Sequence, residues 1–166
     1  MVRPLMAGAL LACGVVADAA MGVAFPDAGG VPVISLSTVT GLALISGSSR
    51  GMLFGFAVGV VLDLLAGPAV VGGAHALVGV PVGAVAGAIG RPAPGRLHAA
   101  PLVGMVVVPV AVTAALLVHG LLGPVVFAAP EALWRAGVAG ALVTPLVVRV
   151  ARQCAVRPLP NLAPRA

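Results

Sequence analysis

Residues 51–87 read GMLFGFAVGVVLDLLAGPAVVGGAHALVGVPVGAVAG, and this stretch decides how the chain folds. Glycine recurs at every fourth position in each half, at Gly51, Gly55 and Gly59 and then at Gly79, Gly83 and Gly87. Small residues at this spacing on apolar helices let two backbones approach closely in lipid, where packing replaces the hydrophobic driving force. The stretch therefore predicts two membrane helices that pack along their glycine rows, with a turn at Gly67-Pro68-Ala69.

The two glycine rows also predict a register for this hairpin. In an antiparallel pair, two residues at equal depth lie the same number of positions before and after the centre of the turn. With the centre at Ala69, the rows pair Gly51 with Gly87, Gly55 with Gly83 and Gly59 with Gly79. One further step of four residues along each row reaches Asp63 and His75. We therefore expect Asp63 and His75 to face one another just below the outer surface, with a water between them if the helices diverge there.

Asp63 is the polar residue of the hairpin that most needs an explanation. A carboxylate in hydrocarbon costs ~2.5–3.5 kcal/mol on insertion scales. It could be a proton site, a ligand contact or a partner contact. Alternatively, it pairs with His75 or Arg135 and pins the hairpin, and this structural interpretation is favoured for a residue so close to the interface.

Outside the hairpin, further apolar runs indicate more helices of the same kind. Six segments are apolar, at 4–25, 31–46, 51–67, 70–90, 99–122 and 132–151, and each separator is rich in Gly or Pro, as at Gly47-Ser48-Ser49-Arg50. Continuous apolar runs favour helices over a closed barrel, which needs short alternating strands. The sequence thus predicts an all-α polytopic membrane protein, with a six-helix transmembrane domain at 1–151 and a short basic cytoplasmic tail at 152–166. The segment 31–46, which carries several hydroxyl residues, is the least secure crossing.

Composition supports a membrane protein and argues against nucleic-acid binding. Of the 166 residues 61% are apolar and only 8% are charged, against roughly a quarter charged in soluble domains. The net charge of +5 comes from nine arginines that stand singly between apolar runs. Nucleic-acid binders instead cluster basic residues on one face.

The arginines predict how the helices are oriented. With the N-terminus in the cytoplasm and six crossings, all but one fall on the cytoplasmic side: Arg3, Arg50, Arg91, Arg96, Arg149, Arg152, Arg157 and Arg165. Only Arg135, next to the interfacial anchor Trp134, falls outside. The positive-inside rule therefore predicts a multi-pass protein of the bacterial cytoplasmic membrane with both termini in the cytoplasm.

No motif in the sequence predicts an enzyme. There is no metalloprotease, hydrolase or phosphate-binding pattern, and Asp18 with Asp63 matches no recognisable protease motif. We expect no catalytic, cofactor or metal site, and we assign Asp18 no role. Leu11-Ala12-Cys13 is similar to a lipoprotein cleavage site, but the apolar run continues past it, as in a spanning helix.

The central hairpin resembles the signature of the rod shape-determining protein MreD family. That family shows a Gly-Phe-x-x-Gly-Leu-x-x-Asp run, then Leu-Gly-x-x-Ala-Leu and a Gly-rich helix; this chain has Gly55-Phe56, Gly59-Val60, Asp63, Ala76-Leu77 and Gly83. The segment Leu142-Val143-Thr144-Pro145-Leu146 is similar to the family's last helix. The chain departs from the family pattern at Pro32-Val33, where many members have Pro-Asp, and at Trp134-Arg135, where Tyr-Asn is usual.

This resemblance implies a non-enzymatic component of the bacterial cell-wall elongation machinery. Its expected partners are the membrane helix of an MreC-like bitopic protein, with MreB, a RodA-type polymerase and a transpeptidase nearby. The family's fold is thought to be shared with substrate-binding subunits of energy-coupling-factor transporters, so a vitamin- or metal-uptake subunit is the alternative. With four Phe, one Trp and no Tyr, the chain has few aromatic side chains that could line a pocket for such a ligand. A small holin-like or generic membrane protein is the third possibility.

Overall fold

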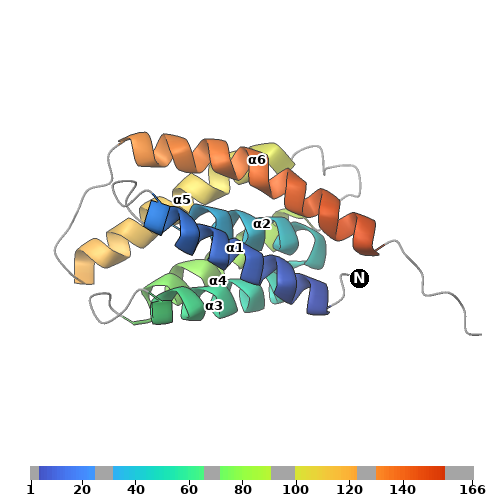
Figure 1. Ribbon diagram of the computed structural model, residues 1–166, viewed down its shortest axis with the longest axis horizontal. Helices are drawn as coiled ribbons and strands as arrows, with labels where there is room; N and C mark the ends of the chain where they lie inside the picture. Colours follow the sequence, from blue (N-terminus) through green and yellow to red (C-terminus); the bar gives the residue numbers. More distant parts are fainter. Residues whose placement is uncertain (1–3, 25–31, 66–71, 91–99, 123–129, 156–166) are drawn as a thin grey trace, which may run out of the picture.

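The computed structural model describes residues 4–24, 32–65, 72–90, 100–122 and 130–155. These residues form the bundle of six helices in Figure 1: α1 (Pro4–Ala24), α2 (Val33–Ser46), α3 (Ser48–Leu65), α4 (Ala74–Gly90), α5 (Ala100–Leu122) and α6 (Pro130–Ala155). Each predicted apolar segment corresponds to one helix, so the prediction of an all-helical chain with six apolar helices is confirmed for the described residues. The helix α6 continues past the predicted boundary at 151, and residues 156–166 of the predicted tail lie outside the described residues.

The break between α2 and α3 is shorter than the sequence predicted. The expected separator was Gly47-Ser48-Ser49-Arg50, but only Gly47 lies between the two helices. Gly47 has a φ of 85°, a left-handed conformation that glycine adopts without a Cβ penalty. Its N–H group donates to the carbonyl of Ala43 at 2.9 Å. One residue therefore suffices to end α2 and redirect the chain.

The helix α2 is the centre of the bundle, although its segment was the least secure crossing in the sequence. It packs against all five other helices, and its residues from Ser35 to Leu44 are buried. The hydroxyls of Ser37, Thr38 and Thr40 each donate to a carbonyl four residues earlier in the helix, at 2.7–2.8 Å. Because these hydroxyls are satisfied within α2, they can be buried at small cost.

Four of the remaining helices form two antiparallel pairs around α2, and α1 packs mainly against α2. The pairs α3 with α4 and α5 with α6 have the most extensive contacts in the bundle. In the second pair, a Cβ atom built at Gly104 would collide with the backbone of Gly140, and the reverse also holds. Both pairs are therefore joined by glycine at their closest approach.

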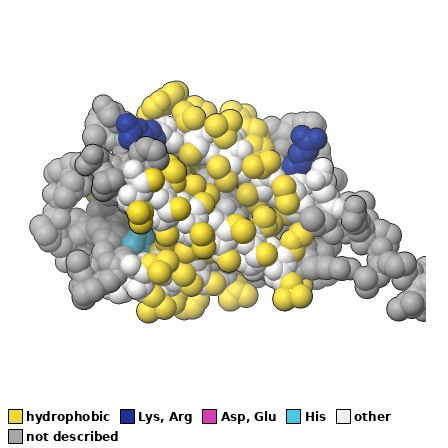
Figure 2. Space-filling view, in the orientation of Figure 1, with side chains coloured by type: hydrophobic (Ala, Val, Ile, Leu, Met, Phe, Trp, Pro, Cys, Tyr) yellow, Lys and Arg dark blue, Asp and Glu magenta, His cyan; other side chains and the backbone are white. Residues whose placement is uncertain are grey.

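The surface of the bundle is apolar between two charged ends. Large hydrophobic side chains are exposed on all the outer helices, such as Leu5 on α1, Leu53 on α3 and Leu146 on α6. In Figure 2 these side chains cover the middle of the visible face, and basic side chains lie toward its two ends. The helices α1 and α3 and the Leu133–Gln153 part of α6 are long and apolar enough to cross a membrane; α2, α4 and the Ala100–Ala114 part of α5 are apolar but shorter. These features indicate membrane association.

Candidate functional site

The glycine rows lie in the contact between α3 and α4. A Cβ atom built at Gly51 would collide with the backbone of Gly83, and one built at Gly55 would collide with the backbone of Gly79. Cβ atoms built at Gly79 and Gly83 would meet the same partners from the other side. At these four positions the two helices are in backbone contact, which only glycine permits.

The contact extends beyond these pairs at both ends. Gly59 lies against the backbone of Ala76, and Gly87 lies against the backbone of Gly47 and Ser48. All six glycines singled out in the sequence therefore lie in one seam, which we call the glycine seam: Gly51, Gly55, Gly59, Gly79, Gly83 and Gly87.

The register of the seam differs from the predicted one by a helical turn. Gly51 was expected opposite Gly87, but it meets Gly83, and Gly55 meets Gly79 in place of Gly83. The predicted glycine pairs were wrong because the two rows were matched end to end, whereas rows of equal spacing pair equally well when one is shifted by a single four-residue step. The spacing of the glycines therefore predicts the contact between the helices but does not fix its register.

Asp63 and His75 meet because their side chains lean along their helices. Cα–Cβ bonds tilt toward the N-terminus of their own helix. Asp63 lies one turn beyond Gly59, and its side chain therefore tilts back along α3 toward the first turn of α4. The side chain of His75, in that first turn, tilts toward the N-terminal end of α4 and so toward Asp63. The predicted contact is present, and it is direct, with 2.8 Å between His75 Nδ1 and Asp63 Oδ1.

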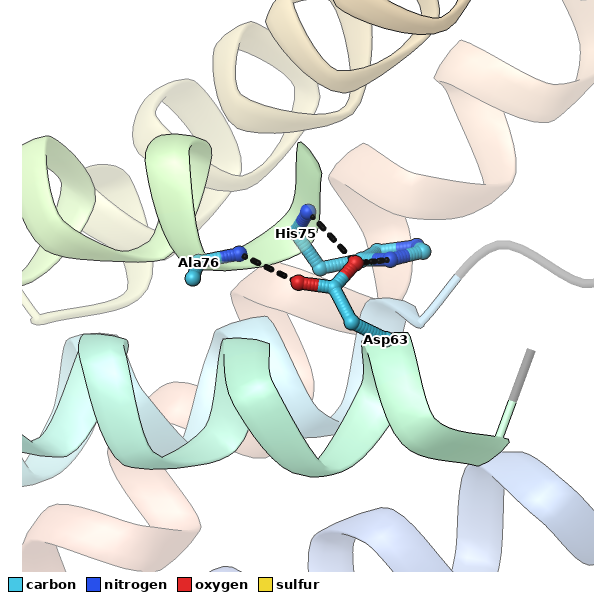
Figure 3. Close-up of polar contacts among 3 residues, drawn as sticks. All are labelled: Asp63, His75 and Ala76. Atoms are coloured by element: carbon cyan, nitrogen blue, oxygen red, sulfur yellow. Dashed lines mark hydrogen bonds and ion pairs between the residues drawn. The ribbon is translucent and has the colours of Figure 1, made fainter. Parts of the chain in front are cut away.

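The carboxylate of Asp63 also caps α4. Figure 3 shows it pointing from α3 at the start of α4, where Oδ1 accepts from the backbone N–H of His75 at 3.0 Å and Oδ2 from that of Ala76 at 3.3 Å. These are the second and third residues of α4, whose N–H groups have no acceptor inside the helix. A negative charge is also stabilised by the positive end of a helix dipole. Asp63 thus performs, from a neighbouring helix, the task that an N-cap residue usually performs within its own.

Asp18, to which the sequence assigned no role, makes the same contact with α2. Its Oδ1 accepts from the backbone N–H of Ile34 at 2.9 Å, and its Oδ2 from that of Ser35 at 2.7 Å. Ile34 and Ser35 are the second and third residues of α2, the positions that His75 and Ala76 occupy in α4. Each carboxylate therefore stands near the end of one helix and caps the next.

A sequence signal for this second cap exists. Gly14 precedes Asp18 by four residues, as Gly59 precedes Asp63. A Cβ atom built at Gly14 would lie 3.4 Å from Ser35 Cα, and one built at Gly59 would collide with Ala76. In both hairpins a glycine allows the next helix to approach closely. The aspartate one turn later accepts hydrogen bonds from the first backbone N–H groups of that next helix. The Gly-x-x-x-Asp pattern shared by α1 and α3 could have predicted both caps.

The described residues offer two kinds of empty space. A small apolar cavity of about 10 Å³ lies among α2, α3 and α4 beneath His75. A larger groove of about 440 Å³ runs between α4 and α5 and is lined by apolar residues, including Leu77, Pro81 and Val85. Among the residues described, no group of three or more His, Cys, Asp or Glu could hold a metal ion. The polar contacts described above thus form two helix caps, at the starts of α2 and α4, and the larger groove is apolar.

Comparisons with known proteins found no match for this chain among protein-family models, curated proteins or solved structures. The class of the protein, an all-helical chain with membrane-type helices, follows from the structure.

Proposed function

We propose that this chain is a non-enzymatic, MreD-like scaffold of the bacterial wall-elongation machinery, built from six helices that cross the cytoplasmic membrane. The observation that carries the proposal is the α3–α4 hairpin. The residues that resemble the MreD signature, including Gly55, Gly59 and Asp63, are those that form the seam and the cap. The signature thus has a physical purpose in this chain: it makes a thin, fixed hairpin.

The arrangement of charges supports a topology with both termini in the cytoplasm. Figure 1 shows α1 and α3 beginning at the end of the bundle where α6 terminates. Arg50 near the start of α3 and Arg149 and Arg152 near the end of α6 are exposed there. Trp134 and Arg135 lie at the other end of α6. An excess of basic residues at one end is typical of the cytoplasmic side.

We propose that the groove between α4 and α5 receives the single membrane helix of an MreC-like partner. On α4 the groove is bordered by Leu77, Pro81, Val85 and Ile89, which recur every four residues and form one ridge. A ridge of this spacing packs into the groove of another helix. The glycine seam, on the other side of α4, holds this ridge in place.

Filling the groove tests this function. Val85 in the groove and Leu53 on α3 are both more than half exposed, so Val85→Trp and Leu53→Trp add similar bulk to different lipid-facing surfaces. We expect Val85→Trp to reduce co-purification with the MreC-like protein at least tenfold and to make rod-shaped cells round, while Leu53→Trp leaves both unchanged. Equal co-purification and unchanged shape for both variants, at equal abundance, would overturn the docking proposal.

The groove gives little support to the alternative function, a substrate-binding subunit of an uptake transporter. Its volume lies in the range of ligand pockets, but such pockets place several polar groups against the ligand. The lining residues of the groove are all apolar. A helix or an acyl chain suits that lining better than a vitamin.

A further inference from the structure

The lipid-facing apolar belt of the bundle is short on two helices, α4 and α6. Among the described residues, large exposed hydrophobic residues extend from Leu77 to Ile89 on α4 and from Trp134 to Leu146 on α6. At 1.5 Å per residue each of these stretches measures about 18 Å along the helix axis. The hydrocarbon core of a typical bilayer is about 30 Å thick. Any tilt of the helices would shorten the belt further.

Exposed charged residues delimit the belt on α6. Arg135 and Arg149 are both exposed, and the helix rises only about 21 Å between them. Trp134, which is 66% exposed, stands beside Arg135 as an aromatic residue of the interface would.

Two outer helices carry longer stretches. Exposed hydrophobic residues extend from Leu5 to Val23 on α1, which is about 27 Å, and from Leu102 to Leu117 on α5, which is about 22 Å. The short belt is therefore a property of the α4 and α6 surfaces and not of every helix.

We propose that the α4 and α6 surfaces hold the adjacent bilayer at a hydrocarbon thickness of about 20 Å, so that the lipid surface this protein fits is one of short acyl chains. The inference rests on the proposed membrane location but not on the MreC-like partner. A short hydrophobic stretch is accommodated either by thinning of the bilayer or by side chains that extend to the interface. Long arginine side chains can do the latter, so the two outcomes must be separated by experiment.

The test uses the full chain reconstituted in phosphatidylcholine vesicles with monounsaturated chains of fourteen to twenty-two carbons. Flotation with the vesicles is checked first, and the unfolding temperature is then measured in each lipid. We expect the highest unfolding temperature at fourteen or sixteen carbons and a fall of about 5 to 10 °C at twenty-two carbons. A maximum at eighteen or more carbons, or no dependence on length, would overturn the thinning proposal alone. Failure to float would overturn the membrane location as well.

A substitution at the inner boundary of α6 gives a second measurement. In Arg149→Leu the next exposed basic residue is Arg152, so the belt lengthens by three residues, about 4.5 Å. We expect the optimum to move to longer chains in this variant and to stay in place in the matched control Arg149→Lys. The sole tryptophan, Trp134, reports its depth through quenching by brominated lipids, and it should keep the same depth below the headgroups as the chains lengthen, because the adjacent bilayer thins to fit the protein. An unmoved optimum in Arg149→Leu, or a Trp134 that lies deeper in longer chains, would contradict thinning and favour extended arginines.

Discussion

Asp63 in α3 accepts a hydrogen bond from the backbone N–H of His75 in α4 at 3.0 Å, and the same oxygen lies 2.8 Å from His75 Nδ1. A second carboxylate oxygen accepts from the next backbone N–H group, that of Ala76. The carboxylate thus contacts the backbone of α4 more than it contacts a side chain. This geometry separates the roles of Asp63 and His75 and leads to the first prediction.

Removing the carboxylate should cost more than removing the imidazole. In Asp63→Ala two N–H groups at the start of α4 lose their acceptor, which should reduce the free energy of unfolding by about 1–3 kcal/mol. In His75→Ala the backbone N–H groups keep the Asp63 carboxylate as their acceptor. We therefore expect the free energy of unfolding to fall by less than half as much as in Asp63→Ala. Unfolding in mixed micelles followed by circular dichroism measures both. A larger loss for His75→Ala than for Asp63→Ala would contradict the capping role.

The cap should also be distinguishable from a functional carboxylate. Asp63→Asn keeps one acceptor oxygen and removes the charge, whereas Gly55→Leu disrupts the seam without touching the site. If both variants only lower the abundance of the protein, and activity in cells follows abundance, Asp63 is structural. Loss of cell shape in Asp63→Asn at normal abundance would instead support a proton, ligand or partner contact.

The glycine seam should tolerate no added methyl group. In Gly55→Ala the new Cβ would meet the backbone of Gly79, so α3 and α4 must separate, and we expect a loss of about 1–3 kcal/mol. Gly8→Ala is the matched control, because Gly8 lies in α1 with nothing within 4 Å of an added Cβ. Thermal unfolding should show a lower midpoint for Gly55→Ala and an unchanged or slightly higher one for Gly8→Ala. Equal midpoints would show that the backbones are not in contact.

Asp18 should be as important to stability as Asp63. In Asp18→Ala the N–H groups of Ile34 and Ser35 lose their acceptor at the start of the most buried helix, so we expect a loss of about 1–3 kcal/mol. Because the two aspartates cap different helices, the losses should add in the variant Asp18→Ala/Asp63→Ala to within about 0.5 kcal/mol. Unfolding of the two single variants and the double variant checks this. A neutral Asp18→Ala would contradict the second cap.

The helices could be predicted from the sequence because each is a continuous apolar run that ends near Gly or Pro. The glycine seam could be predicted as well, because two matched rows of glycine have few other uses in apolar helices. The register could not, since it depends on where α4 begins, and Ala74 carries no start signal in the sequence.

Two other features were hidden for different reasons. The central place of α2 was missed because hydropathy counts Ser37 and Thr40 as polar, although each is satisfied inside its own helix. The cap by Asp18 was missed because the N–H groups that it caps, those of Ile34 and Ser35, lie in the next helix, and the sequence does not show the geometry of the connection to that helix. The Gly-x-x-x-Asp pattern that it shares with Asp63 is present in the sequence, but its meaning as a helix cap becomes clear when the two hairpins are compared.

Cysteine labelling shows whether the proposed α3–α4 hairpin crosses the cytoplasmic membrane with its turn outside. Gly72 and Ser49 are exposed near opposite ends of the hairpin, so Gly72→Cys and Ser49→Cys are compared in a chain whose Cys13 and Cys154 are replaced by alanine. With a membrane-impermeant maleimide and intact spheroplasts, we expect labelling of Gly72→Cys at once and of Ser49→Cys only after permeabilisation. Labelling of Ser49→Cys in intact spheroplasts, with Gly72→Cys protected, would contradict it.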